Sequence, residues 1–258
     1  MKVRILGCSG GIGGRTLRTT SMLVDDDVLI DAGTGVGELS LAELALIDHV
    51  FITHSHLDHT AWLPLMIDAI ADQRDRPITV YATGETIDIL RQHIFNWVIW
   101  PDFSEIAFRE QAAMRYEAIT VGQKIVLGAR SITALPAEHT VPAVGYHLDS
   151  GFGSLVFTGD TTVNEALWPV INRIGNLRYL LIETAFSNDG HGLARTSKHL
   201  CPSLLRTELA KLSATARQAQ IYITHLKPGL AELIMREIGE CAGAFNARAL
   251  QCDQVFEF

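Results

Sequence analysis

The sequence contains little that is typical of a secreted or membrane-spanning protein. It has only four cysteines in 258 residues, none of them in a CxxC pair or near the histidines of residues 54–59, so we expect reduced thiols rather than a disulfide framework. No apolar run reaches the ~18 residues that a membrane-spanning helix needs, and no signal-peptide pattern follows Met1. We therefore expect a cytoplasmic protein that has no membrane partner.

Positive charge is also scarce. The 21 lysines and arginines are outnumbered by 29 aspartates and glutamates, which gives a formal net charge of -8, and the basic residues do not cluster. Because neutralisation of phosphates dominates the binding of long nucleic acids, we expect no extended nucleic-acid partner and favour a small-molecule substrate. A Pro/Gly/Ser-rich linker is absent too, so the chain, which is 48% apolar, is predicted to form a single domain over residues 1–258.

The most informative segment is residues 54–59 (HSHLDH), which follows the apolar stretch 50–53. Imidazole and carboxylate groups are ligands for divalent first-row cations. In a short extended turn His54 and His56 point the same way, so they can share one ion. Asp58 and His59 come after the chain has turned, and they can hold a second ion a few ångströms away. The segment therefore predicts a site for two metal ions.

Further candidate ligands stand where short apolar runs end. Runs rich in Val, Ile and Leu end at, or lead to, the following residues: Asp31, His54, His139, Asp160 and His225. In layered α/β folds, loops at the edge of a sheet carry the site while the strand bodies form the core. These five side chains are therefore expected to meet at one edge.

Helices are expected between these strands. Apolar spacing predicts them over residues 38–47, 61–74, 85–98, 203–213 and 231–241. The order Asp31 then His54, repeated as Asp160 then His225, also suggests an internal duplication of one unit. That unit would consist of a strand ending in aspartate, a helix and a strand ending in histidine.

Together these residues resemble a known family. The motif His54-x-His56-x-Asp58-His59, with Asp31, His139, Asp160 and His225, resembles the metallo-β-lactamase-fold hydrolases over nearly the whole chain. The resemblance implies an αββα sandwich of two mixed β-sheets flanked by helices. It implies these roles: ligands of a first metal for His54, His56 and His139, ligands of a second for Asp58, His59 and His225, and a bridge between the metals for Asp160. Asp31 would support the histidine loop from behind by hydrogen bonds.

Other segments are similar to the class II cyclic-nucleotide phosphodiesterases of this fold. They are residues 6–11 (LGCSGG), 93–97 (HIFNW) with 100–104 (WPDFS), 198–202 (KHLCP) and 221–228 (IYITHLKP). The resemblance implies hydrolysis of 3',5'-cyclic nucleotides, cAMP or cGMP, to 5'-monophosphates by a metal-bridging hydroxide. It also implies catalytic roles for Asp58 and Asp160.

The segment 95–103 is expected to contact the substrate. Its four aromatic residues are predicted to form a lip on which a nucleobase stacks: Phe95, Trp97, Trp100 and Phe103. Asn96 lies within this lip and is a further candidate contact. The alternative for each ring is ordinary core packing.

His199 is a candidate proton donor to the leaving oxygen. Related phosphodiesterases of the fold, including tRNA 3'-end processing endonucleases, have a catalytic histidine in a comparable segment. The alternative is a surface or helix-capping histidine, and the sequence does not decide between the two.

Several properties stay open at this level. Nitrogen and oxygen donors without thiolate suit two ions of zinc, our first expectation, or of manganese or iron. The alternative functions are a tRNA 3'-processing-type endonuclease, a glyoxalase-type thioesterase, or a non-catalytic metal or nucleotide sensor. A homodimer is also open, with the apolar segment 94–100 as a candidate contact.

Overall fold

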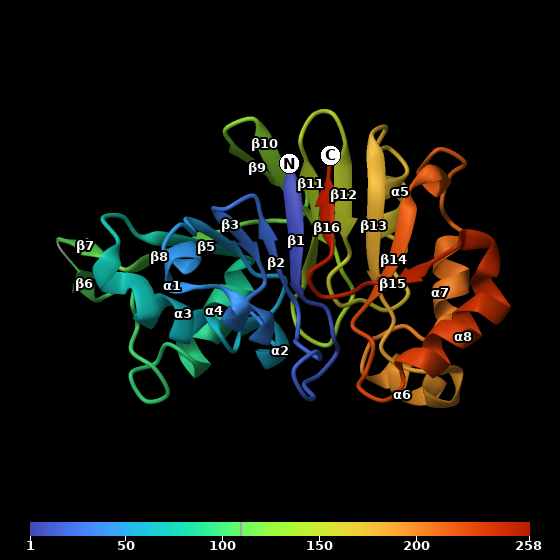
Figure 1. The fold of residues 1–258 in the computed structure, drawn as a ribbon, viewed down its shortest axis with the longest axis horizontal. Helices are drawn as coiled ribbons and strands as arrows, with labels where there is room; N and C mark the ends of the chain where they lie inside the picture. The colour runs from blue at the N-terminus through green and yellow to red at the C-terminus, as the bar shows by residue number, and fades with distance from the viewer. Residues whose placement is uncertain (109) are drawn as a thin grey trace.

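The computed structural model describes residues 1–108 and 110–258. Two seven-stranded sheets face each other (Figure 1). The strands of the first sheet, in spatial order, are β16 (Val255–Glu257), β1 (Lys2–Gly7), β2 (Ser21–Val24), β3 (Val28–Ile30), β4 (His49–Phe51), β5 (Ile78–Ala82) and β8 (Met114–Ala118). Those of the second are β15 (Arg248–Ala249), β14 (Gln220–Thr224), β13 (Leu177–Glu183), β12 (Ser154–Phe157), β11 (Val144–Asp149), β10 (Arg130–Pro136) and β9 (Lys124–Leu127).

Helices cover the outer faces of both sheets. On the first sheet they are α1 (Leu41–Leu44), α3 (Leu63–Ile70) and α4 (Gly84–His93), and on the second α5 (Leu167–Ile171), α7 (Pro202–Leu209) and α8 (Ala231–Ala242). Two short helices, α2 (Leu57–Thr60) and α6 (His191–Thr196), lie instead at the lower end of the molecule in Figure 1. Short 3-10 turns are η1 (Thr34–Glu38), η2 (Ala71–Gln73), η3 (Asn188–Gly190), η4 (Ala216–Gln218) and η5 (Gly243–Phe245), and β6 (Ala107–Phe108) pairs with β7 (Gln111–Ala112). This architecture confirms the predicted αββα sandwich.

The apolar side chains form three layers of core. One lies between the sheets, and one lies between each sheet and its helices. Alternate residues of a strand serve different layers, since successive side chains point to opposite faces. Val50 of β4 packs toward the helices, whereas its neighbour Phe51 packs between the sheets, stacked on Tyr81. Side chains on both faces of β4 are thus buried, which explains the apolar run at residues 50–52.

Strand direction brings the functional loops together. In the first sheet β3, β4 and β5 are parallel, and in the second β12, β13 and β14 are parallel. The carboxyl ends of parallel strands share one edge of their sheet, so the loops that follow them gather there. Helix α2, which follows β4, lies at the lower edge of the sheets in Figure 1.

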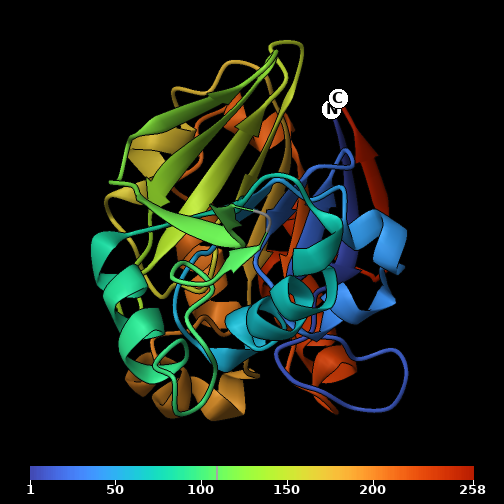
Figure 2. The ribbon, with the colours of Figure 1, turned by 90° about the vertical axis from the view of Figure 1, so that its left-hand side faces the viewer.

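The two ends of the chain also meet. Strand β1 pairs antiparallel with β16, and the amino group of Met1 donates to the carbonyl oxygen of Phe258 at 2.7 Å. Figure 2 shows both termini at the same corner of the first sheet. The last residues of the chain therefore complete the sheet that the first residues begin.

Some helices are shorter than predicted. The helix expected over 85–98 ends at His93, because Asn96 accepts hydrogen bonds from the amides of Val98 and Ile99 and builds a turn instead. In the region 38–47 only Leu41–Leu44 is α-helical, and Ser40, the residue before it, forms a capping box with Glu43. The other three predicted helices are present with ends shifted by a few residues.

None of the helices within the described ranges combines the length and the apolar character that crossing a membrane requires. That residues 1–258 form a single domain stays a prediction.

Candidate metal centre

The first group of candidate ligands lies on the loop after β4. The backbone is extended at His56, with φ -63° and ψ 146°, and α2 begins at the next residue. Asp58 and His59 therefore stand in the first turn of a helix, while His54 and His56 precede it. This change of backbone direction separates the two pairs, as the sequence spacing predicts.

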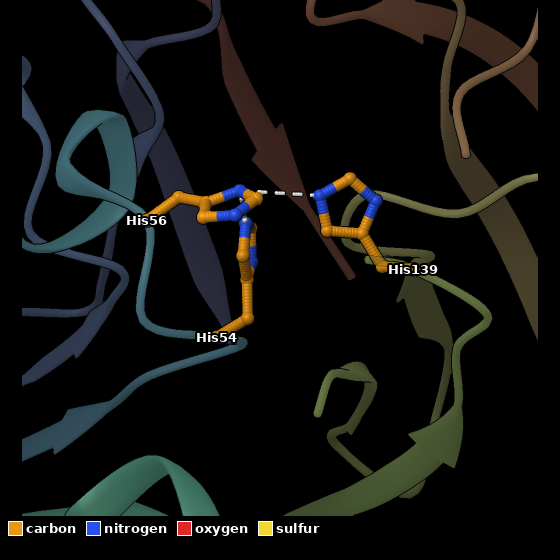
Figure 3. Close-up of side chains that lie close together, drawn as sticks. All are labelled: His54, His56 and His139. Atoms are coloured by element: carbon orange, nitrogen blue, oxygen red, sulfur yellow. Dashed lines mark hydrogen bonds between the residues drawn. The ribbon is translucent and has the colours of Figure 1, made fainter. Parts of the chain in front are cut away.

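Three imidazole rings converge beside this loop. Nδ1 of His56 lies 3.1 Å from Nε2 of His54 and 3.2 Å from Nε2 of His139 (Figure 3). His139 comes from the loop after β10, in the opposite sheet. Three ring nitrogens directed at one another form a donor set that could hold a cation.

A second donor set lies next to the first. Its ligand atoms, on Asp58, His59, Asp160 and His225, are all within 4.8 Å of one another. Among the described residues, Nε2 of His59, Oδ2 of Asp160 and both ring nitrogens of His225 are buried atoms with no hydrogen-bond partner. Buried polar atoms are rarely left unsatisfied, and a cation would satisfy these.

Asp160 lies between the two donor sets. Its Oδ2 is 3.4 Å from Nε2 of His59 and 3.8 Å from Nε2 of His54, and its Oδ1 is 3.3 Å from Nδ1 of His225. The turn that delivers it requires Gly159, which has φ +62° and whose Cβ, if present, would lie 2.7 Å from the carbonyl oxygen of Val144. The carboxylate therefore reaches both sets at once.

Buried charges balance one another in this centre. Burial disfavours the charged form of Asp160, but His225 and His59 outweigh it and hold the pKa of Asp160 well below its usual value. Burial also disfavours protonated His59, yet Asp160 and Asp31 raise the pKa of His59 well above the usual value. Burial lowers the pKa of His225 to about 3 and that of His139 to about 4. These two imidazoles are therefore neutral near pH 7, with lone pairs available to a cation.

Asp31 forms hydrogen bonds that support the loop after β4, which carries His54, His56, Asp58 and His59. It is fully buried after β3, and its Oδ1 accepts a hydrogen bond from the backbone amide of Thr53 at 2.7 Å. Its Oδ2 lies 2.7 Å from Nδ1 of His59 and accepts from the Thr53 hydroxyl at 2.9 Å. A carboxylate at Nδ1 keeps a proton on that nitrogen, so Nε2 of His59, which faces the second donor set, is the nitrogen that would bind a cation once its own proton is displaced.

Sequence reasoning missed Glu183, the partner of His199. Glu183 is fully buried at the end of β13, and its Oε1 lies 2.7 Å from Nδ1 of His199. Burial lowers the pKa of His199, but Glu183 more than compensates, so the net shift is upward. The ring of His199 stacks on that of His225 with centroids 5.1 Å apart. The signal for Glu183 was in the sequence, because it too is a metal-binding residue type at the end of an apolar run.

The order of the strands differs between the two halves of the suggested duplication. Strands β3 and β4, which precede Asp31 and His54, are neighbours, but β13 lies between β12 and β14. The acidic residue beside the His225 strand is therefore Glu183, not Asp160. The two halves therefore differ by one strand, β13, which lies between the strand before Asp160 and the strand before His225, and the duplication stays a hypothesis.

The predicted aromatic lip is only partly available to a ligand. Phe95 and Phe103 are 2% and 3% exposed and belong to the core between the first sheet and its helices. Hydrophobic burial thus prevails for these two rings, and their predicted stacking on a nucleobase is wrong. Trp97 is 60% exposed and Trp100 is half-buried, and their contact with a substrate stays a prediction. The side-chain oxygen of Asn96 accepts hydrogen bonds from the backbone amides of Val98 and Ile99 within the local turn.

The sequence matches the beta-lactamase superfamily domain over residues 26–226, and the chain belongs to this superfamily. The predicted resemblance is therefore confirmed, and with it the class of metal-dependent hydrolases.

Two curated relatives are more specific. A "Probable 3',5'-cyclic-nucleotide phosphodiesterase" of Yersinia pestis is 27% identical, over 72% of this chain and 59% of the relative. A "3',5'-cyclic-nucleotide phosphodiesterase" of Aliivibrio fischeri is 26% identical, over 87% of this chain and 81% of the relative. The match thus spans about three fifths of the Yersinia protein. The crystal structure of unliganded yeast PDE1 has the same fold, with a TM-score of 0.82 at 19% identity and coverage of 100% of this chain and 99% of that one.

Proposed function

We propose that this protein hydrolyses 3',5'-cyclic nucleotides to 5'-monophosphates with two divalent metal ions. The observation that carries the proposal is the pair of adjacent donor sets with Asp160 between them. Binuclear sites with a shared ligand are suited to the cleavage of phosphodiesters. The choice of substrate is supported by the two relatives that are named cyclic-nucleotide phosphodiesterases.

Zinc is the first candidate for both ions, and manganese or iron would accept the same donors. The two sets offer imidazole nitrogens and carboxylate oxygens, and no described thiol belongs to either. When bound, such ions lower the pKa of a water to near neutrality and offset charge on phosphoryl oxygens. Asp160 and Asp58 would contribute the negative charge that holds two cations close together.

His199 is the residue that we propose as proton donor to the leaving 3'-oxygen. Its Nδ1 is hydrogen-bonded to Glu183, so Nε2 is the nitrogen that can donate a proton to a substrate. A ring nitrogen of His199 lies within 4.8 Å of ligand atoms of both His139 and Asp160, which is close to where a scissile phosphate would bind. Glu183 would orient the ring and favour its protonated form.

A cleft beside His139 offers room for the nucleoside part. Its volume is about 950 Å³, and its walls include Thr83, Glu85 and Asp88 from the start of α4 and Glu138 from the loop that carries His139. Clefts of roughly 300–1,000 Å³ are typical of small-molecule sites. The carboxylates in these walls would accept hydrogen bonds from the N–H groups of a base.

The first test is hydrolysis of cyclic AMP and cyclic GMP by the purified protein. Zinc or manganese is added in one series and removed by a chelator in the other, and the 5'-monophosphate is measured. Metal-dependent formation of the 5'-monophosphate would support the proposal. Cleavage of a generic activated phosphodiester, with neither nucleotide touched, would refute the substrate and retain the two-metal chemistry.

Two further substrates test the alternatives. Cleavage of a precursor tRNA, with cyclic nucleotides untouched, would indicate a processing endonuclease, although the net charge of -8 argues against this partner. Hydrolysis of a thioester alone would indicate the glyoxalase-type reaction. Inertness toward all these substrates in a metal-loaded protein would indicate a sensor.

A further inference from the structure

Two cysteines from opposite ends of the sequence lie together behind the first strand. Cys8 follows β1, and Cys252 lies between β15 and β16. The amide of Asp253 donates to the carbonyl oxygen of Ile5 at 2.7 Å, which fixes the C-terminal segment against β1. Cys8 and Cys252 line the same cavity of about 420 Å³. Only the tertiary structure reveals this pair, because its members have no CxxC-like spacing.

The two thiols lie close enough for each to shift the pKa of the other. Each sulfur also meets a backbone carbonyl, Cys8 Sγ that of Leu250 at 3.4 Å and Cys252 Sγ that of Thr16 at 3.5 Å. Both residues are partly exposed. Proximity of two accessible thiols is the first requirement for a bond between their sulfurs.

A cation beside the pair makes one thiol the better nucleophile. The hydrogen bond from Cys8, together with the charge of Arg18, lowers the pKa of Cys252 to about 6 although burial opposes this. Arg18 is held in place by the carbonyl oxygen of Leu6, at 2.8 Å from its Nε, and by the carboxylate of Asp253, at 3.2 Å from its Nη2. Cys8 and Arg18 therefore favour the thiolate form of Cys252, which is the reactive form of cysteine.

The other two cysteines provide an internal comparison. Cys201 is fully buried, with its sulfur 3.3 Å from the hydroxyl of Ser203. Cys241 donates to the carbonyl oxygen of Pro202 at 3.4 Å, and burial raises the pKa of its thiol. Cys241 also has a guanidinium, that of Arg206, and a second thiol, that of Cys201, nearby, yet its pKa is raised, whereas the pKa of Cys252 is lowered.

We propose that Cys8 and Cys252 form a peroxide-reactive thiol pair that closes to a disulfide. The Cys252 thiolate attacks one oxygen of hydrogen peroxide, the O–O bond breaks, and a sulfenic acid and hydroxide result. The Cys8 sulfur then attacks the Cys252 sulfur, the S–S bond forms, and the S–O bond breaks. The hydroxyl group of the sulfenic acid leaves as water, with a proton that comes from the Cys8 thiol or from solvent. Each sulfur gives up one electron, and the peroxide is reduced to two molecules of water.

The test is a thiol count on the full-length, zinc-loaded protein before and after hydrogen peroxide. The untreated chain has four thiols, and we expect two to remain after peroxide and four again after dithiothreitol. After free thiols are alkylated, digestion and mass spectrometry should identify one linkage, between the peptides that contain Cys8 and Cys252. A chain that retains all four thiols, or a linkage through Cys201 or Cys241, would overturn the proposal.

Three variants separate the roles of the two sulfurs. Cys252→Ser should lose the linkage and keep its three thiols. Cys8→Ser should instead accumulate a sulfenic acid at Cys252, which dimedone traps and mass spectrometry locates. Cys241→Ser is the matched control and should form the same linkage as the parent protein. Formation of the disulfide at equal rates without peroxide, by air alone, would overturn the assignment of peroxide as the reactant.

Discussion

The two sheets contribute to the candidate metal centre in different ways. The first sheet provides four candidate ligands from one segment of six residues, and Asp31 and Thr53 hold that segment from behind. The second sheet provides three, His139, Asp160 and His225, from the ends of three separate strands. The first group depends mainly on local backbone geometry, whereas the second depends on the order in which distant strands pair.

The two halves nevertheless use the same supporting device. In each, a fully buried carboxylate at a strand end lies 2.7 Å from Nδ1 of a histidine: Asp31 with His59, and Glu183 with His199. The supported histidines differ in their proposed roles, since His59 is a metal ligand and His199 a proton donor. One arrangement can therefore serve metal binding in one half and proton transfer in the other.

The largest effect is expected at the residue that both donor sets share. Asp160→Asn removes a negative charge between them, so the protein should bind less metal and lose about 10³-fold or more in turnover, since several kcal/mol of charge stabilisation are at stake. Metal content is measured by atomic spectroscopy, and turnover with cyclic AMP. Asp26→Asn, at an exposed position of the β2–β3 turn, is the matched control. Unchanged metal content and turnover in Asp160→Asn would refute the bridging role.

The next largest effect tests the proton donor. His199→Gln should lower turnover about 100-fold while the metal content stays the same, as is typical for the loss of a general acid. A substrate analogue with a better leaving group needs less protonation and should recover much of the rate. Loss of metal in this variant would mean that His199 is a ligand, as its distance to His139 and Asp160 also permits.

The two supporting carboxylates should have separable effects. Asp31→Asn is expected to weaken metal affinity about 10-fold to 100-fold, because loss of an outer-shell partner lowers the basicity and the alignment of His59. Glu183→Gln should leave metal affinity near that of the parent and reduce turnover. Competition with a chromophoric chelator measures the metal affinity. Equal loss of affinity in both variants would contradict the division of roles between the halves.

The smallest effect concerns local mobility after removal of the metal. Chelation should increase amide hydrogen exchange in residues 137–141 and 225–228 more than in residues 54–60. The latter segment keeps its hydrogen bonds to Asp31, and the hydroxyl of Thr60 still donates to the carbonyl oxygen of His56 at 3.0 Å. Exchange measured by mass spectrometry in the presence and absence of chelator gives the comparison. Equal increases in the three segments would show that both halves depend on metal alike.

Much of the fold and of the candidate site could be predicted where the signal is local or repeated. Residues 54–59 indicated two groups of candidate ligands because the local backbone geometry of so short a segment can be judged from its sequence. Asp31, Asp160 and His225 could be identified because each ends an apolar run. Glu183 fitted the same pattern and was missed because glutamate does not occur in the family motif. Phe95 was assigned to a lip, although only packing against the first sheet decides that its ring is buried.

The sequence by itself determined the class of fold, the division of the histidine segment into two pairs of candidate ligands and the types of side chain that follow the strands. These properties follow from alternating burial along strands and from short-range geometry, which neighbouring residues set together. The tertiary structure alone decided that Glu183 supports His199, that Phe95 lies in the core and that Cys8 meets Cys252. Each of these contacts joins or packs segments far apart in the chain, so it depends on strand order and sheet packing, which no local pattern specifies.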